Sequence, residues 1–193
     1  ALGVSIPTVS RALKDSPEIS RELCTKAKAL AKEMNYRPNP FAMSLRKNAP
    51  RIIGVIVPDI VTHFFASILN GIENMAIANG YFVIITTSHE SYEHEKRNIE
   101  NLVNMRVEGI IACLSQETTD FSHISALKDI NMPLILFDRV CLTDQFSSVI
   151  ADGAQSAQMA TQHLLDNGSK RVAFIGGANH LDIVKRRKHG YLE

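Results

Sequence analysis

The sequence contains no tryptophan, few other aromatic residues and three cysteines among 193 residues. Because the cysteines, Cys24, Cys113 and Cys141, are odd in number, far apart and set among apolar residues, we expect buried reduced thiols without disulfides or metal. No apolar run approaches the roughly 20 residues that a transmembrane helix needs, and no charged-then-apolar leader opens the chain. These absences predict a cytoplasmic protein that makes no contact with a membrane.

The net charge of +1 hides an uneven distribution of charge along the chain. Residues 1–51 carry ten lysine and arginine residues against four acidic residues, a balance of +6. The remaining residues carry eleven basic and sixteen acidic residues, a balance of −5. The basic N-terminal part therefore predicts a polyanionic partner such as a nucleic acid.

The basic part begins with the pattern of a turn followed by two short amphipathic helices. Gly3 permits a positive φ, Ser5 stands where a helix N-cap is expected, and an apolar stripe follows at helical spacing. Ser20 is the expected cap of a second helix, which ends near Asn35 because Pro38 disfavours helical backbone before it. A DNA recognition helix would use the polar face of the first helix, Thr8, Ser10 and Arg11. Any capped amphipathic helix fits the same local pattern.

Residues 38–50 form a proline-bracketed segment that is long enough for one or two helical turns. A plain linker is the simplest interpretation of this segment. However, Phe41, Met43 and Leu45 are apolar and stand next to the basic Arg46 and Lys47. Apolar side chains beside bases of this kind can wedge into the minor groove while the cations hold phosphates.

Short apolar runs alternate with helical patterns from residue 51 onward. We expect strands at 52–57, 81–86, 108–113, 133–137, 148–151 and 171–175, and helices near 64–79, 92–105, 121–131 and 154–167. This alternation predicts an α/β fold, with a parallel sheet covered on both faces by helices. Ligands of such sheets bind at the carboxyl ends of the strands, so candidate ligand-binding residues are those that follow each strand.

No set of residues in the sequence has the spacing of a catalytic or metal centre. The polar run 88–95 holds two histidines and three glutamates without metal-ligand spacing, and its consecutive Ser-His-Glu cannot form a nucleophile relay. Gly176-Gly177 lacks the Lys-Ser/Thr of a phosphate-binding loop and the remaining glycines of a dinucleotide fingerprint. We therefore expect a protein that is not an enzyme and uses no cofactor and no metal.

Several motifs occur along the chain in a fixed order. They are Gly3-Val4-Ser5 with Thr8-Val9-Ser10-Arg11, Asn35-Tyr36-Arg37-Pro38-Asn39, Ile53-Gly54-Val55-Ile56-Val57-Pro58, Phe64-Phe65, Gly71-Ile72-Glu73, Val107-Glu108-Gly109-Ile110-Ile111, Asp138-Arg139 and Ala173-Phe174-Ile175-Gly176-Gly177. As an ordered set that covers essentially the whole chain, they resemble the LacI/GalR family of transcriptional regulators. The resemblance also implies that the family's first DNA-binding helix would precede Ala1 and that most of a second core lobe would follow Glu193.

The resemblance implies four segments. Residues 1–37 would be a helix-turn-helix DNA-binding domain that lacks its first helix, and residues 38–50 a hinge with a short helix. Residues 51–193 would be a periplasmic-binding-protein-like, doubly wound core. Its first lobe is 51–151, and 152–193 is the start of its truncated second lobe.

The implied function is that of a homodimeric repressor that binds a palindromic double-stranded DNA operator. A small-molecule effector, a sugar or related metabolite, would control this binding. A solute-binding protein of transport or chemotaxis, which shares the core fold, is the alternative. A small α/β enzyme acting on sugars is a third possibility, which would need a convergent acid–base set.

For the DNA-binding part, the resemblance places the helix at residues 6–13 in the major groove. The residues implied to contact DNA are Ser5, Ile6, Pro7, Thr8, Ser10, Arg11, Ser20, Asn35, Asn39, Ala42 and Leu45. The guanidinium of Arg11 fits guanine O6 and N7, with a phosphate contact as the alternative. Leu45 is the expected wedge, paired with the same residue of a second subunit, in a segment that folds as it binds DNA.

For the core, the residues implied to bind the effector are Phe64, Phe65, Asp138 and Arg187. The phenylalanines can stack on a sugar, although core packing is the alternative for at least one of them. Asp138 can accept hydrogen bonds from hydroxyl groups, with a structural ion pair to a base such as Arg139 as the alternative. The chain departs from the family pattern near this implied pocket, at Thr62-His63 in place of Asn-Pro and at Asp152-Gly153 in place of Asp-Asn.

Overall fold

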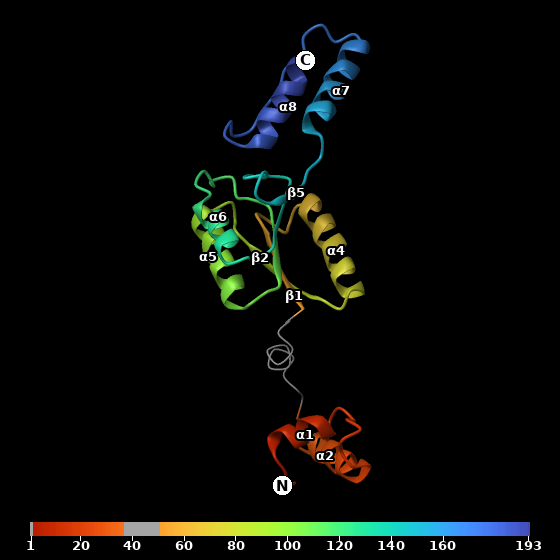
Figure 1. The fold of residues 1–193 in the computed structure, drawn as a ribbon. Helices are drawn as coiled ribbons and strands as arrows, with labels where there is room; N and C mark the ends of the chain where they lie inside the picture. The colour runs from red at the N-terminus through yellow and green to blue at the C-terminus, as the bar shows by residue number, and fades with distance from the viewer. Residues whose placement is uncertain (1, 37–50) are drawn as a thin grey trace. The chain divides into compact units, whose positions relative to one another are not determined.

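The computed structural model describes residues 2–36 and 51–193 and divides the chain into an N-terminal unit, residues 1–48, and a core unit, residues 49–193 (Figure 1). The helices are α1 (Ile6–Ala12), α2 (Arg21–Glu33), α4 (His63–Ala78), α5 (Tyr92–Asn104), α6 (Ser122–Asp129), α7 (Gly153–Asp166) and α8 (Asp182–Leu192). The strands are β1 (Ile52–Val57), β2 (Phe82–Thr87), β3 (Gly109–Ala112), β4 (Leu134–Phe137) and β5 (Ser147–Val149). Within the described residues, no helix is long and apolar enough to cross a membrane.

The two helices of the N-terminal unit begin at the caps that the sequence predicts. Oγ of Ser5 accepts a hydrogen bond from the amide of Thr8 at 3.4 Å, and Oγ of Ser20 accepts one from the amide of Leu23 at 3.3 Å. A small apolar cluster of Ala12, Cys24 and Ala27 joins α1 to α2. The expected hinge at 38–50, with Asn39, Ala42 and Leu45, lies outside the described residues.

The core unit is built on a five-stranded parallel sheet with the order β2-β1-β3-β4-β5. Helix α4 covers one face, and α5 and α6 cover the other (Figure 1). The expected doubly wound α/β fold is therefore confirmed. The order reverses between β1 and β3, so the loops that follow these two strands flank the switch point where open α/β sheets bind ligands.

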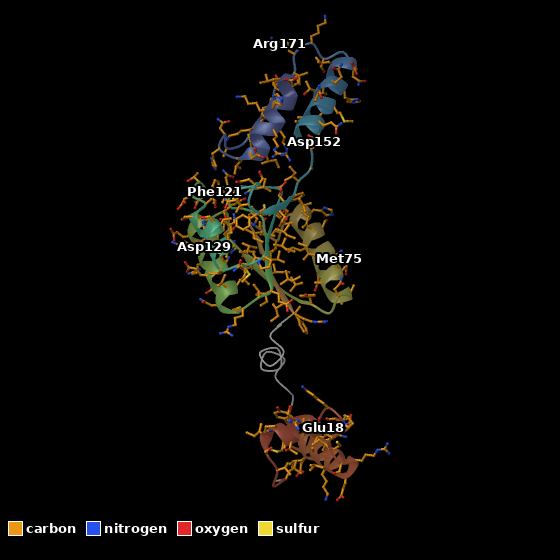
Figure 2. The ribbon with its side chains drawn as sticks, viewed as in Figure 1. Glu18, Met75, Phe121, Asp129, Asp152 and Arg171 are labelled. Atoms are coloured by element: carbon orange, nitrogen blue, oxygen red, sulfur yellow. The ribbon has the colours of Figure 1, made fainter. Side chains whose placement is uncertain are left out.

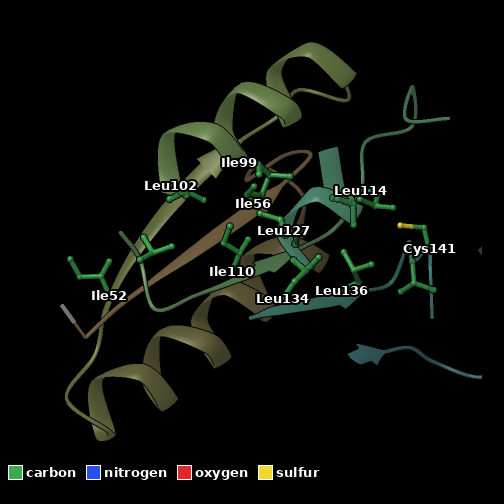
Figure 3. Close-up of a cluster of buried hydrophobic side chains, with 14 residues drawn as sticks. Ile52, Ile56, Ile99, Leu102, Ile110, Leu114, Leu127, Leu134, Leu136 and Cys141 are labelled. Atoms are coloured by element: carbon green, nitrogen blue, oxygen red, sulfur yellow. The ribbon is translucent and has the colours of Figure 1, made fainter. Parts of the chain in front are cut away.

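Side chains of β1 alternate between two separate apolar cores, as the period of a strand requires. Ile52 and Ile56 point into the core under α5 and α6, which Figure 3 shows. Val55 and Val57 point into the core under α4. Gly54 belongs to the first of these faces, and a Cβ added to it would stand 2.6 Å from Cδ1 of Leu102, so glycine lets α5 approach the sheet closely.

The expected strand at residues 171–175 does not form, and that expectation is wrong for this structure. Residues 171–178 adopt neither helix nor strand, and Ile175 is 96% exposed. A strand needs the backbone of a neighbouring strand for its hydrogen bonds, and the segment pairs with none among the described residues. The structure also contains α8, which the alternation pattern did not indicate.

Helices α7 and α8 pack side by side because glycine removes a side chain at their closest approach (Figure 1). A Cβ added to Gly190 would lie 1.9 Å from the carbonyl oxygen of Ala154, a distance that no side chain can tolerate. Directly after Gly190, the Tyr191 ring stacks on the Phe174 ring at a centroid distance of 5.3 Å, and the Tyr191 hydroxyl donates to the Val172 carbonyl at 2.8 Å.

We predict that Gly190→Ala separates α7 from α8 and lowers the free energy of unfolding by about 1–3 kcal/mol or more, the usual cost of forcing atoms into packed space. Gly71→Ala is the matched control, because Gly71 is also helical but has no atom within 4 Å of an added Cβ. The control should be stabilised by up to about 1 kcal/mol through helix propensity. Urea unfolding followed by far-UV circular dichroism suits this tryptophan-free chain. Equal effects of the two substitutions would contradict the packing argument.

Candidate functional site

Helix α1 presents a polar and exposed face opposite the stripe that packs on α2. Ile6 is 85% exposed, Pro7 is exposed, and the Arg11 side chain is 58% exposed. Thr8 and Ser10 are half-buried. The hydroxyls of Ser5 and Thr8 lie 2.8 Å apart and bond to one another, so both are already engaged in capping the helix. The exposed hydrogen-bonding group with the longest reach on this face is the Arg11 guanidinium.

Ion pairs within the N-terminal unit leave an excess of positive charge. Lys26 pairs with Glu22 at 2.7 Å, and Lys28 contacts both carboxylate oxygens of Asp15 at 2.6 and 2.5 Å. Nη1 of Arg11 lies 3.1 Å from Oε2 of Glu18. Within residues 2–36, which the structure describes, Lys14, Arg21 and Lys32 form no ion pair, so their charges remain available to an anion.

The other two predicted DNA contacts of this unit that the structure describes lie at the ends of α2. Ser20 is exposed and its hydroxyl caps α2. Asn35 is exposed and follows the last turn of α2 with φ of +49°, a left-handed conformation that asparagine tolerates better than most residues. The structure therefore leaves both residues accessible at the surface.

In the core unit, Asp138 and Arg187 line the same small cavity, as the sequence analysis expects of effector-binding residues. The cavity has a volume of about 70 Å³ and is also lined by Gly153, Ser156 and Asp182. Burial raises the pKa of the Asp138 carboxyl, and the positive charges of Arg139 and Arg187 offset part of that effect. Asp138 also has a φ of +59° directly after β4, which turns the chain away from the sheet.

The two phenylalanines do not join Asp138 and Arg187 in lining this cavity. Phe65 is buried in the core under α4, with its ring centroid 6.4 Å from that of Phe137. Phe64 packs edge-on against Phe65 at 5.1 Å and is 49% exposed. Phe65 is therefore a core residue, which is the alternative that the sequence left open for one of the pair. Phe64 keeps an exposed ring face at the start of α4.

The ion pair of Arg139 is formed with Glu90 rather than with Asp138. The guanidinium contacts both carboxylate oxygens of Glu90, at 2.6 and 3.0 Å, and donates to the Leu114 carbonyl at 3.2 Å. Oε2 of Glu90 also accepts a hydrogen bond from the amide of Gln116 at 2.7 Å. These contacts tie together the loops that follow β2, β3 and β4 and hold the residue next to Asp138.

A further hydrogen bond connects this edge of the sheet to the segment before α8. Nε2 of His180 lies 2.7 Å from the carbonyl oxygen of Gln116. The sequence motifs predict no specific role for Glu90, Gln116 or His180. The signal that points to Glu90 and Gln116 is their place in the loops that follow β2 and β3, where parallel sheets gather their functional residues.

A separate polar cluster lies entirely inside the core unit, between α5 and α6. Glu95 is fully buried, and its Oε1 accepts from Nε2 of His123 at 2.8 Å and from the Thr118 hydroxyl at 3.0 Å. Its Oε2 accepts from the amide of Ser115 at 2.5 Å. Since Oε1 of Glu95 also accepts from the Thr118 hydroxyl, Nε2 of His123 is assigned as a donor to the same oxygen. The cluster fixes the loop after β3 from inside the protein.

The cysteines are buried and free, as predicted from their surroundings. Burial raises the pKa of the Cys113 and Cys141 thiols to about 12 in each case, which keeps both protonated at neutral pH. Among the described residues, no group of histidine, cysteine and carboxylate side chains is arranged to hold a metal ion.

Comparisons with known proteins match both units. Residues 1–39 match the model of "Bacterial regulatory proteins, lacI family", and residues 51–193 match that of "Periplasmic binding proteins and sugar binding domain of LacI family". Catabolite control protein A of Priestia megaterium is 32% identical over 98% of this chain and 58% of its own length. The ribose operon repressor of Bacillus subtilis is 32% identical over 100% of this chain and 57% of its own length.

Among solved structures, a lac repressor dimer bound to operator and the anti-inducer ONPF superposes with a TM-score of 0.76 and 26% identity, over 99% of this chain and 58% of that one. The chain spans somewhat more than half the length of the curated relatives it matches. The resemblance that the ordered motifs indicate is confirmed over both units. The chain belongs to the LacI family of bacterial regulatory proteins.

Proposed function

We propose that the protein is a transcriptional repressor that binds a palindromic double-stranded DNA operator as a homodimer and responds to a small-molecule effector, a sugar or related metabolite. The observation that carries the proposal is the exposed face of α1, with Arg11, in a basic unit whose sequence matches the lacI regulatory model. That match favours a regulator over a solute-binding protein of transport or chemotaxis. The protein would act on DNA in the cytoplasm, without a catalytic centre, a metal or a cofactor.

In this proposal, the exposed face of α1 enters the major groove. The side chains of Ile6 and Pro7 can neither donate nor accept hydrogen bonds, so they would contact thymine methyl groups or select groove shape. Hydrogen-bonded base recognition then depends mainly on Arg11, since the hydroxyls of Ser5 and Thr8 are engaged with each other. Ser20 and Asn35 would contact phosphates. The DNA contacts of Asn39, Ala42 and Leu45, which lie outside the described residues, remain predictions from the sequence.

We predict that Arg11→Ala weakens binding to a duplex that the protein itself selects from a randomised pool by about 5- to 150-fold, the value of a good arginine–guanine contact. Binding to a random duplex should weaken much less, because only one phosphate contact is lost there. Gel shifts at one fixed salt concentration measure both affinities. Lys32→Ala, which removes an exposed cation from the last turn of α2, is the control. Equal losses on both duplexes would show that Arg11 contacts phosphate alone.

For the effector, we propose that Asp138 and Arg187 both bind hydroxyl groups in the cavity that they line. Asp138 accepts and Arg187 donates. The half-exposed ring of Phe64 does not line this cavity but offers an apolar surface at the start of α4, which follows β1 at the same edge of the sheet. Asp152 is engaged in capping α7, because its Oδ1 accepts from the amide of Gln155 at 3.0 Å. Gly153 makes room for Arg187, whose Cγ would lie 3.4 Å from an added Cβ.

We predict opposite effects of Asp138→Asn on stability and on effector binding. Because burial raises the pKa of this carboxyl, its ionised form destabilises the folded state at neutral pH, and asparagine removes that cost. The free energy of unfolding should rise at pH 7, and the gain should disappear below the ordinary pKa of aspartate, where both the folded and the unfolded state are protonated. Asparagine also tolerates the positive φ.

The same variant should lose the thermal shift that a panel of sugars and nucleosides produces in the wild type. Ser156→Ala is the comparison for a neutral polar group of the same cavity. A variant that is stabilised and still shows the full thermal shift would remove Asp138 from the effector site. A variant that is destabilised at pH 7 would contradict the account of its burial.

For the homodimer, we propose an interface on α4 and the edge strand β2. Met75 (labelled in Figure 2) and Ile77 are 67% and 64% exposed on the last turns of α4, and Phe82 is 67% exposed at the start of β2. A solved relative in this family is a dimer by its title. Large exposed apolar side chains gathered on two consecutive elements favour a protein contact there.

We predict that Met75→Glu combined with Ile77→Glu converts the dimer to a monomer, because each buried contact would then desolvate a charge. Sedimentation equilibrium measures the change. Ile130→Glu, at the end of α6 on the other side of the sheet and 55% exposed, is the matched control and should leave the dimer intact. Dissociation by the control, or a persistent dimer in the double variant, would place the interface elsewhere.

A further inference from the structure

The turn between α1 and α2 places an acidic side chain against the residue that we propose contacts bases. Nη1 of Arg11 donates to Oε2 of Glu18 at 3.1 Å, and the Glu18 side chain is 68% exposed. Figure 2 labels Glu18 in the N-terminal unit. A carboxylate at the edge of a DNA-binding face repels phosphate groups and lowers the net attraction of the unit for any DNA. The position of Glu18 therefore cannot be explained by a gain in sequence-independent affinity for DNA.

The turn holds Glu18 in place relative to α1. The amide of Ser16 donates to the Arg11 carbonyl at 3.1 Å, and the amide of Ile19 donates to the Ser16 carbonyl at 3.0 Å. The ion pair of Asp15 with Lys28 fastens the start of the turn to α2. The backbone on both sides of Glu18 is thus fixed before any DNA is bound.

The contact with Glu18 leaves Arg11 able to contact a base. A guanidinium carries five N–H donors in a planar fork, and Glu18 occupies a position at Nη1. Recognition of guanine O6 and N7 requires two donors from another edge of the fork. Arg11 can therefore keep its bond to Glu18 while it contacts guanine, and the bond restricts the rotation of a long and otherwise flexible side chain.

We propose that Glu18 is a specificity-determining residue, which orients Arg11 toward guanine and disfavours the use of Arg11 as a phosphate contact. This inference rests on the proposed DNA-binding function. On a random duplex, Arg11 must leave Glu18 to reach a phosphate, and the freed carboxylate then faces the DNA backbone. On the selected site, Arg11 keeps its partner and neither cost arises. Glu18 thus weakens binding to random DNA more than binding to the operator.

The effect should be modest and measurable, because an exposed ion pair changes an equilibrium by about fivefold at most. Fluorescence anisotropy at one salt concentration gives the dissociation constants for a random duplex and for a duplex that the wild type selects from a randomised pool. For Glu18→Gln we expect about three- to fivefold tighter binding to the random duplex and less than about twofold change on the selected duplex. The ratio of the two constants, which measures specificity, should fall.

Glu22→Gln is the matched control for net charge. Glu22 lies four residues further along, in the first turn of α2, and its side chain is 78% exposed and paired with Lys26 instead of Arg11. Its substitution removes the same charge from the same unit, so binding to both duplexes should tighten to a similar degree, with an unchanged ratio. A second test uses the Arg11→Ala background, in which adding Glu18→Gln should leave the ratio as it is in Arg11→Ala alone.

Three results would overturn the role of Glu18: an unchanged ratio in Glu18→Gln, an equal fall of the ratio in Glu22→Gln, or a further change of the ratio in the Arg11→Ala background. These results are distinct from a failure of the proposed function. If the wild type enriches no sequence from the pool, the DNA-binding function itself is refuted, and the inference with it. If it enriches a sequence and the ratio does not respond to Glu18→Gln, only the inference fails.

Discussion

The core unit depends on the burial of β1 between two strands and two layers of helices. Its backbone pairs with β2 on one side and β3 on the other, and its side chains supply both apolar cores. Such a strand has no exposed face, so its sequence is almost entirely apolar and its register with both neighbours is fixed. This constraint sets where β1, β3 and β4 end and therefore where the loops with polar side chains stand.

The polar side chains at that edge form a connected set. Arg139 is held by Glu90, Glu90 holds the amide of Gln116, and the carbonyl of Gln116 meets His180 from the segment before α8. Asp138 precedes Arg139 in the sequence and lines a small cavity together with Arg187, in an environment that opposes its ionisation. Polar side chains that bind ligands often lower the stability of the folded protein, because the hydrogen bonds and charges reserved for the ligand have no partner without it.

Patterns within a few residues of one another could be predicted from the sequence. The caps at Ser5 and Ser20 and the left-handed glycines Gly80 and Gly168 after helices need no information from distant parts of the chain. The first five strands and their parallel arrangement follow from apolar periodicity. The expected strand at 171–175 shows the limit of this reasoning, because a strand forms only where a partner backbone is available.

Contacts between distant residues could not be predicted in the same way. Glu90 and Arg139 are 49 positions apart, and Gln116 and His180 are 64 apart, so nothing in either neighbourhood specifies the partner. The tight contact at Gly190 is invisible in the sequence for the same reason, since it depends on where α7 lies. The ion pair of Arg11 with Glu18 is closer in sequence, yet it depends on the conformation of the turn between two helices.

We propose that α1 contacts guanine bases in the major groove through Arg11. Protection of guanine N7 from methylation by dimethyl sulfate tests it most directly, because N7 is exposed in that groove and is one of the two atoms that the arginine fork would cover. We expect protected guanines at symmetric positions in the two halves of a selected duplex, with protection lost in Arg11→Ala. Binding of the wild type that leaves every guanine N7 open to methylation would contradict it.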